Sequence, residues 1–73
     1  MKHILERRDS LTSREIEVLR LIAAGKANKL VASDLSITEG TVKGHVKSIL
    51  SKLGANDRTQ AVTLGLKRGI IEL

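Results

Sequence analysis

Apolar residues recur along this chain at the three- and four-residue spacing that places them on one face of a helix. The pattern predicts four helices, whose boundaries lie at residues that commonly begin or end helices. The expected ranges are Thr12–Ala24, Asn28–Leu35, Thr38–Leu53 and Asp57–Arg68. We therefore expect an all-α fold, a four-helix bundle in which the second and third helices, joined by a short turn, form a helix-turn-helix.

Capping residues mark these boundaries. Thr12 with Glu15, and Asp57 with Gln60, have the spacing of capping boxes, and Thr38 is a favourable N-cap. Three helices are followed by a glycine that can adopt the left-handed conformation of a helix end, namely Gly25, Gly54 and Gly69. These local signals predict where the helices start and stop.

The third predicted helix has an outward face of glycine, lysine and serine. The residues opposite its apolar stripe are Gly40, Lys43, Gly44, Lys47, Ser48 and Ser51. This face can be an ordinary solvated surface, as we interpret Lys52 to be. However, like charges one turn apart repel each other, and a glycine inside a helix costs roughly 1 kcal/mol. We favour a face that enters the major groove of DNA, where Lys43 and Lys47 contact bases and the glycines let the backbone approach.

The composition narrows the choice of partner. The chain has 73 residues, enough for one domain, and its 13 Lys and Arg against 8 Asp and Glu give a net charge of +5. Such a charge favours a polyanion. The chain contains no Phe, Tyr or Trp, whereas proteins that bind single strands or membrane surfaces use aromatic side chains. Duplex DNA is read without aromatics, so we expect duplex DNA as the partner and no membrane.

No pattern of catalytic or metal-binding residues occurs in the sequence. There is no cysteine, which excludes disulfides and thiolate metal sites. His3 and His45 lie in different segments, and the HExxH, GxSxG and P-loop motifs are missing. We expect no enzymatic activity, no cofactor and no metal. The start is charged and no apolar run approaches the roughly 20 residues of a membrane span, so a cytoplasmic location is expected.

A series of motifs resembles the DNA-binding domain of the LuxR/NarL/FixJ transcription regulators, which include the small GerE type. The motifs are LTSREIEVLRLIAAG, NKxxA, ITEGTVKGHVKSILSKLG and DRTQAV, and the resemblance extends from about Leu11 to Ile70. In that family the third helix is the recognition helix and the fourth commonly forms the dimer contact. The resemblance implies base contacts by Lys43, Gly44 and Lys47, phosphate contacts by Asn28, Lys29, Thr41 and His45, and a structural acid at Glu15.

Two positions depart from the usual pattern of the family. Leu30 stands where a glutamate commonly follows the Asn-Lys pair, which puts a local salt bridge in doubt. Gly44 stands where many members carry a side chain that touches bases, which leaves Lys43 and Lys47 to discriminate between sequences.

The domain boundary is expected near residue 10. Residues 1–10 are charged and are interpreted as a flexible arm or linker remnant, and residues 11–73 as the DNA-binding domain. Full-length members usually place a receiver or ligand-binding domain before this module. We therefore favour the output domain of a response regulator in a two-component system over a stand-alone protein of the GerE type.

The fourth helix carries more apolar width than a four-helix core needs. Val62 and Leu66 lie about 100° around the helix from the side that holds Ala61, Leu64 and Gly65. We expect Val62 and Leu66 to form the contact of a homodimer on DNA. The alternative is that the apolar tail, Ile70, Ile71 and Leu73, folds back to cover them.

Other functions compete with this interpretation. A sigma-factor region-4 module also uses a helix-turn-helix but acts docked on RNA polymerase, which is a further candidate partner. A protein-interaction adaptor would use the basic surface to bind an acidic protein, but it would leave the glycine-lined face unexplained.

Overall fold

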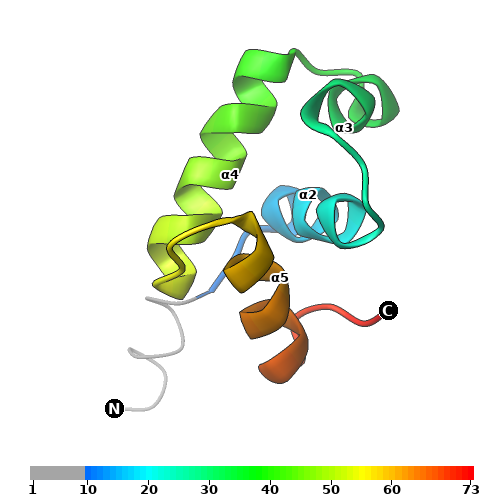
Figure 1. The fold of residues 1–73 in the computed structure, drawn as a ribbon. Coiled ribbons are helices and arrows are strands. Elements are labelled where there is room, and N and C mark those ends of the chain that lie inside the picture. The colour runs from blue at the N-terminus through cyan, green and yellow to red at the C-terminus, as the bar shows by residue number, and fades with distance from the viewer. Residues whose placement is uncertain (1–9) are drawn as a thin grey trace.

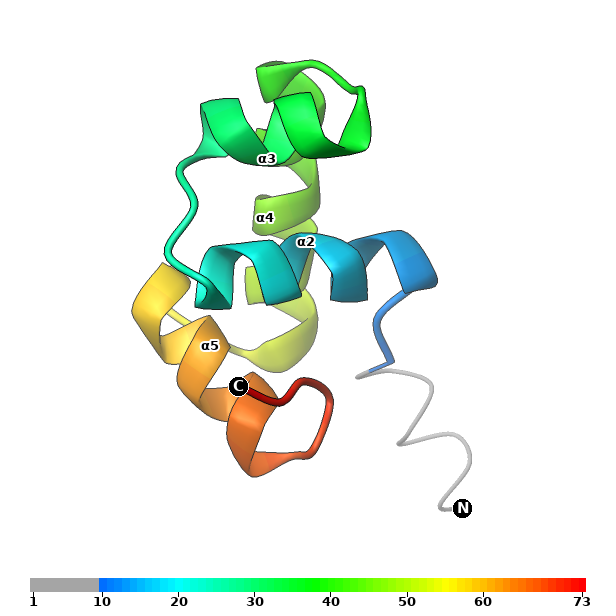
Figure 2. The ribbon, with the colours of Figure 1, turned by 90° about the vertical axis from the view of Figure 1, so that its right-hand side faces the viewer.

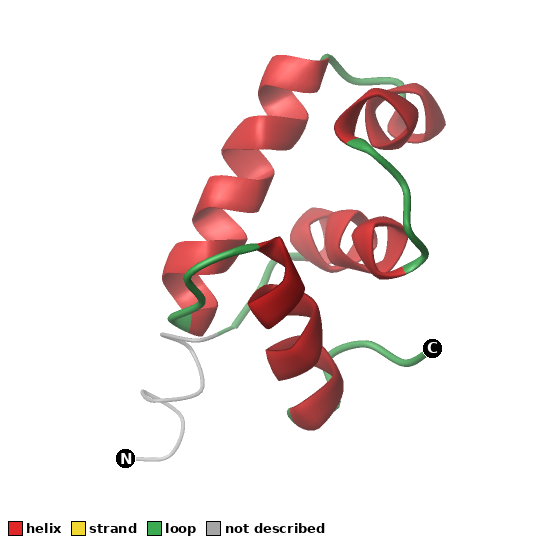
Figure 3. Ribbon diagram, in the orientation of Figure 1, coloured by secondary structure: helices red, strands yellow, loops and turns green. Residues whose placement is uncertain are grey.

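The computed structural model describes residues 10–73, which fold into four α-helices and, within that part of the chain, contain no strand (Figure 1; Figure 3). The helices are α2 (Ser13–Ala23), α3 (Asn28–Leu35), α4 (Glu39–Leu53) and α5 (Arg58–Lys67). Each predicted range agrees with the observed helix to within one residue at either end, so the all-α prediction is confirmed. Most of the predicted arm, residues 1–9, lies outside the described residues.

Helix α4 runs across α2 and α3, which are seen end-on in Figure 1 and side-on, one above the other, in Figure 2. Helix α5 packs against α2 and α4. Among the described helices, α3 and α5 are the one pair that does not pack together. As a result, α3 and the first half of α4 form one end of the domain and most of α5 lies at the other (Figure 1).

The first capping box is confirmed. The Thr12 hydroxyl accepts a hydrogen bond from the Glu15 amide at 3.1 Å, and the Thr12 amide donates to Glu15 Oε1 at 2.8 Å. Thr38 caps α4 as predicted, because its hydroxyl accepts from the Thr41 amide at 3.0 Å. These bonds satisfy amides that the first turn of a helix leaves without a backbone partner.

The second capping box is only half right. The Asp57 side chain accepts from the Gln60 amide at 2.8 Å as expected, but Gln60 Oε1 accepts from the Asn56 amide at 2.6 Å instead of from Asp57. Asp57 is far more extended, with φ −155°, than Thr12, with φ −71°. The amide that reaches the Gln60 side chain is therefore the one that lies one residue further from the helix.

Turns between the helices are tight. Gly25, Gly54 and Gly69 have positive φ, as predicted for residues that follow a helix. The turn of the helix-turn-helix instead uses Ser36, a non-glycine residue with φ 58°, and the Ile37 amide closes the turn on the Ala32 carbonyl at 3.0 Å. At the other end of α3, the N-cap Ala27 provides no side-chain hydrogen bond.

The core is small and purely aliphatic. Its buried residues are Val18, Leu19, Val31, Ala32, Val42, Ile49, Leu53, Ala61 and Ile71. Gly65 belongs to this core, because a Cβ atom there would lie 2.9 Å from Leu19 Cδ2 and 3.1 Å from Ile71 Cγ1. The tail thus folds back through Ile71 onto Gly65, whereas Leu73 remains 89% exposed.

Candidate nucleic-acid interface

The outward face of α4 carries two exposed lysines and two exposed glycines, which have no side chain. Lys43, Gly44 and Lys47 are exposed, as are Gly40 and Ser51. A Cβ atom at Gly44 would meet nothing within 4 Å, and one at Gly40 would meet only Thr38 Oγ1 at 3.8 Å. Packing within the domain therefore does not require glycine at either position.

Ser48 was predicted to belong to this outward face, and that prediction is wrong. Its hydroxyl donates to Glu15 Oε2 at 2.6 Å, and Lys52 donates to Glu15 Oε1 at 2.8 Å. Glu15 is only 4% exposed, and because Thr12 also bonds to it, its carboxylate joins the start of α2 to the second half of α4. Lys52 is therefore half of an ion pair and not an ordinary solvated lysine. The role of Glu15 as a structural acid, which the resemblance implied, has this physical basis.

These partners decide the ionisation of Glu15. Burial by itself raises the pKa of the carboxyl group, but hydrogen bonds from Lys52, Ser48 and the Thr12 amide, together with the charge of Lys52, outweigh burial and lower the pKa from 4.5 to about 2. The carboxylate is therefore charged in the folded domain at any physiological pH.

The four candidate phosphate contacts differ in their surroundings. Lys29 is exposed on the first turn of α3, and His45 is half-buried on α4. Thr41 is exposed, but its hydroxyl shares a hydrogen bond of 2.9 Å with the Thr38 hydroxyl. Asn28 is half-buried, and its side-chain oxygen accepts a hydrogen bond from Arg58.

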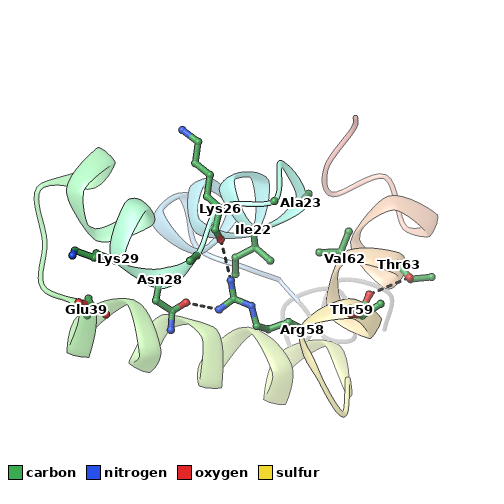
Figure 4. A pocket seen from close by; sticks show the side chains of 12 residues that line it. Ile22, Ala23, Lys26, Asn28, Lys29, Glu39, Arg58, Thr59, Val62 and Thr63 are labelled. Carbon is green, nitrogen blue, oxygen red and sulfur yellow. Dashed lines mark hydrogen bonds between the residues drawn. The ribbon is translucent and has the colours of Figure 1, made fainter.

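An open hollow of about 750 Å³ lies where the end of α2 meets the starts of α3 and α5 (Figure 4). Its apolar side includes Ile22 and Val62, and its polar side includes Asn28 and Arg58. Arg58 donates both to Asn28 and to the Lys26 carbonyl, the latter at 3.2 Å. Sequence reasoning did not single out Arg58, although the DRTQAV motif contains it.

The burial observed on α5 agrees in part with the predicted separation between a side that faces the core and a side that carries the candidate dimer residues. Ala61 and Gly65 are buried, Leu64 is half-buried, and the candidate dimer residues Val62 and Leu66 are also half-buried. Ile71 packs beside Gly65, and Leu73 covers little because it is almost fully exposed. The two candidate residues therefore keep part of their apolar surface open to solvent.

Leu30, which replaces the usual glutamate, is 54% exposed on α3. A salt bridge in this region is made instead by Lys26 and Asp34, whose Nζ and Oδ2 atoms lie 2.5 Å apart. Within residues 10–73 no three His, Cys, Asp or Glu side chains come together as a metal site would require. None of the helices in the described part of the chain is long and apolar enough to cross a membrane.

The four-helix arrangement and its helix-turn-helix define the class of domain, and comparison with known proteins gives the family. Residues 9–64 match the family model described as bacterial regulatory proteins, luxR family. The chain therefore belongs to the luxR family of bacterial regulatory proteins, as the resemblance implied.

Three proteins with similar sequences or structures show which kinds of regulator this chain resembles. The response regulator protein VraR of Staphylococcus saprophyticus is 49% identical over 72 residues, which are 99% of this chain and 34% of VraR. The solved transcription factor GerE is 34% identical with a TM-score of 0.82, over 85% of this chain and 92% of GerE. The solved VqmA of Vibrio cholerae is 39% identical with a TM-score of 0.80, over 84% of this chain and 28% of VqmA.

The chain spans about a third of the length of the curated relatives it matches, and nearly the whole of GerE. It is thus a luxR-type helix-turn-helix domain, the DNA-binding type of domain found in response regulators such as VraR.

Proposed function

We propose that this domain binds double-stranded DNA sequence-specifically, with α4 in the major groove, as the output domain of a bacterial transcription regulator. The observation that carries the proposal is the outward face of α4, where the exposed Gly44 lies beside the exposed Lys43 and Lys47. A glycine inside a helix costs roughly 1 kcal/mol, and no neighbour within the domain needs the space at Gly44. Close approach by another surface explains it, and the net charge of +5 favours a polyanionic one.

In this proposal the two lysines donate to acceptors on base edges, such as guanine O6 and N7, while the backbone at Gly44 approaches the floor of the groove. Backbone phosphates on either side are contacted by Asn28, Lys29, Thr41 and His45. Phosphate contacts set the register of a protein on DNA, whereas base contacts select the sequence.

The test separates base contacts from phosphate contacts. Duplexes are first selected from a random pool, and binding of Lys47→Ala and Lys29→Ala is then measured on selected and scrambled duplexes. Lys47→Ala should weaken binding to the selected duplex by about 1–3 kcal/mol and relax the preference at one base pair. Lys29→Ala should weaken binding to both duplexes similarly and reduce the salt slope by about one. A uniform loss in both variants would make Lys47 a phosphate contact.

For the whole protein we propose a response regulator of a two-component system that acts on bacterial operators, and hence in the cytoplasm. The support is the relationship to VraR, which is named a response regulator. Contact with RNA polymerase is part of this proposal, since a bound regulator must act on transcription.

We further propose that two copies pair on DNA through α5. Val62 and Leu66 are apolar and only half-buried, and the solved VqmA is described as a dimer. A two-fold pair would present two α4 helices to an inverted or near-inverted operator.

The substitution Val62→Asp should abolish cooperative loading of two copies on a two-site duplex, because a carboxylate would enter an apolar contact. Sedimentation with and without the duplex measures this. Ser13→Asp, which adds the same charge at an exposed position of α2, outside the proposed DNA contacts, is the control for charge alone. If Val62→Asp stays folded and still loads two copies cooperatively, α5 is not the dimer contact.

A further inference from the structure

Arg58 connects two helices that do not otherwise pack together. It is the first residue of α5 and is half-buried at the hollow described above. One guanidinium nitrogen, Nη1, donates to Asn28 Oδ1 at the start of α3, and the other, Nη2, donates to the Lys26 carbonyl in the turn before α3 (Figure 4). The guanidinium therefore fixes the start of α3 relative to α5.

This contact determines the orientation of the Asn28 amide. A guanidinium can only donate hydrogen bonds, so the atom of Asn28 that faces Arg58 must be the carbonyl oxygen. If the amide were turned by 180°, its NH₂ group would oppose the N–H groups of Arg58. Without Arg58 both orientations would be available to Asn28.

The NH₂ group of Asn28 is consequently left free for an external acceptor. Its nitrogen, Nδ2, has no hydrogen-bond partner among the described residues. No buried side-chain nitrogen or oxygen in that part of the chain lacks a partner, so Nδ2 is open to solvent. It lies one residue before the exposed Lys29, another candidate phosphate contact.

We propose that Arg58 is a positioning residue for DNA binding, which holds the Asn28 amide with its NH₂ group presented to a backbone phosphate. The proposal rests on the proposed function, in which α3 lies against the phosphates beside the groove. A phosphate oxygen accepts hydrogen bonds, so the reverse orientation would place the amide oxygen against it and repel it.

The choice of arginine permits a test that separates position from charge. A guanidinium presents its N–H groups in a fixed fork and reaches two acceptors at once, whereas the ammonium group of lysine is a point charge on a flexible stem. Arg58→Lys therefore retains the positive charge near the DNA but loses the fixed orientation of Asn28. Arg14→Lys on the exposed surface of α2 is the matched control.

Affinity for a selected duplex is measured for the wild type, Arg58→Lys, Asn28→Ala, the double variant and Arg14→Lys, at a temperature where melting curves show each to be folded. Loss of one hydrogen bond to a charged phosphate should weaken binding about tenfold in Asn28→Ala. Arg58→Lys should approach the same loss. The double variant should bind about as well as Asn28→Ala alone, since the two substitutions remove the same contact with the phosphate. Arg14→Lys should bind like the wild type.

A second measurement does not depend on the variants. In nitrogen-15 spectra of the wild type, the side-chain NH₂ signals of Asn28 should shift when the duplex is added. Wild-type affinity in folded Arg58→Lys, additive losses in the double variant, or unshifted Asn28 signals would each overturn the role of Arg58. A wild type that binds no selected duplex at all would instead overturn the proposed function, so the two failures are distinguishable.

Discussion

Glu15→Gln should lower the free energy of unfolding at pH 7 by about 2–3 kcal/mol, a large fraction of the 5–15 kcal/mol typical of small domains. The substitution keeps the shape of the side chain but removes its negative charge. That charge binds Lys52 and strengthens the hydrogen bonds from Ser48 and Thr12. Urea denaturation followed by circular dichroism measures the difference.

The same carboxylate predicts a pH dependence. The pKa of Glu15 is about 2 in the folded domain against 4.5 ordinarily, so the unfolded chain takes up the proton first as the pH falls. The stabilisation by Glu15, about 3 kcal/mol from the two pKa values, is complete above about pH 5 and is lost between there and pH 2. The gap between wild type and Glu15→Gln should therefore shrink to about 1 kcal/mol near pH 3.

Glu17→Gln provides the control, because Glu17 is an exposed carboxylate of α2 whose pair with Arg14 is 3.6 Å long. Exposed pairs contribute about 0–1 kcal/mol, so this variant should follow the wild type at both pH values. A difference between Glu15→Gln and wild type that stayed constant from pH 7 to pH 3 would contradict the assignment.

Gly44→Leu should stabilise the free domain and at the same time abolish most of its specific DNA binding. Leucine is a better helix former, and its Cβ atom meets no neighbour, so the free energy of unfolding should rise by about 0.5–1 kcal/mol. On DNA the added side chain would hold α4 away from the base edges, so that Lys43 and Lys47 both lose their contacts. The combined loss should reach about 100-fold or more on the selected duplex.

The matched control is Ser51→Leu, two turns further along the same face of α4 and exposed like Gly44. The first turns of a recognition helix usually make the base contacts, and residue 51 lies about 10 Å beyond residue 44 along the helix. Its affinity should stay close to that of the wild type. If Gly44→Leu bound the selected duplex as tightly as the wild type, the proposed approach of α4 to the base edges would be wrong.

Most of the fold could be predicted from the sequence, because its determinants are local. The Thr12 and Glu15 pair, the Thr38 cap and the glycines after the helices act over three or four residues, and apolar spacing predicted how many helices form and where they lie in the chain. The local rule failed at Gln60, where the backbone of Asp57 rather than the residue types decided which amide is bound.

The contacts that could not be predicted are polar and join distant segments. Ser48 reaches Glu15 across 33 residues, and Arg58 reaches Asn28 across 30. Periodicity assigns a serine or arginine to the polar side of its helix but does not say whether another helix lies there. The position of Ser48 at the edge of the outward face allowed either outcome, and only the crossing of α4 over α2 decided it.

Helix α3 has Ala27 as its N-cap, a residue that offers no side-chain acceptor to the amides of the first turn. Serine or aspartate at such a position usually stabilises a helix by about 1 kcal/mol. Residue 27 is therefore a natural position for a substitution meant to raise the thermal stability of the domain. The start of a helix is also where a DNA phosphate can accept hydrogen bonds from backbone amides, here beside Lys29. Under the proposed function, a side-chain cap engineered at residue 27 would compete with such a phosphate for those amides, so that thermal stability would rise while affinity for DNA would fall.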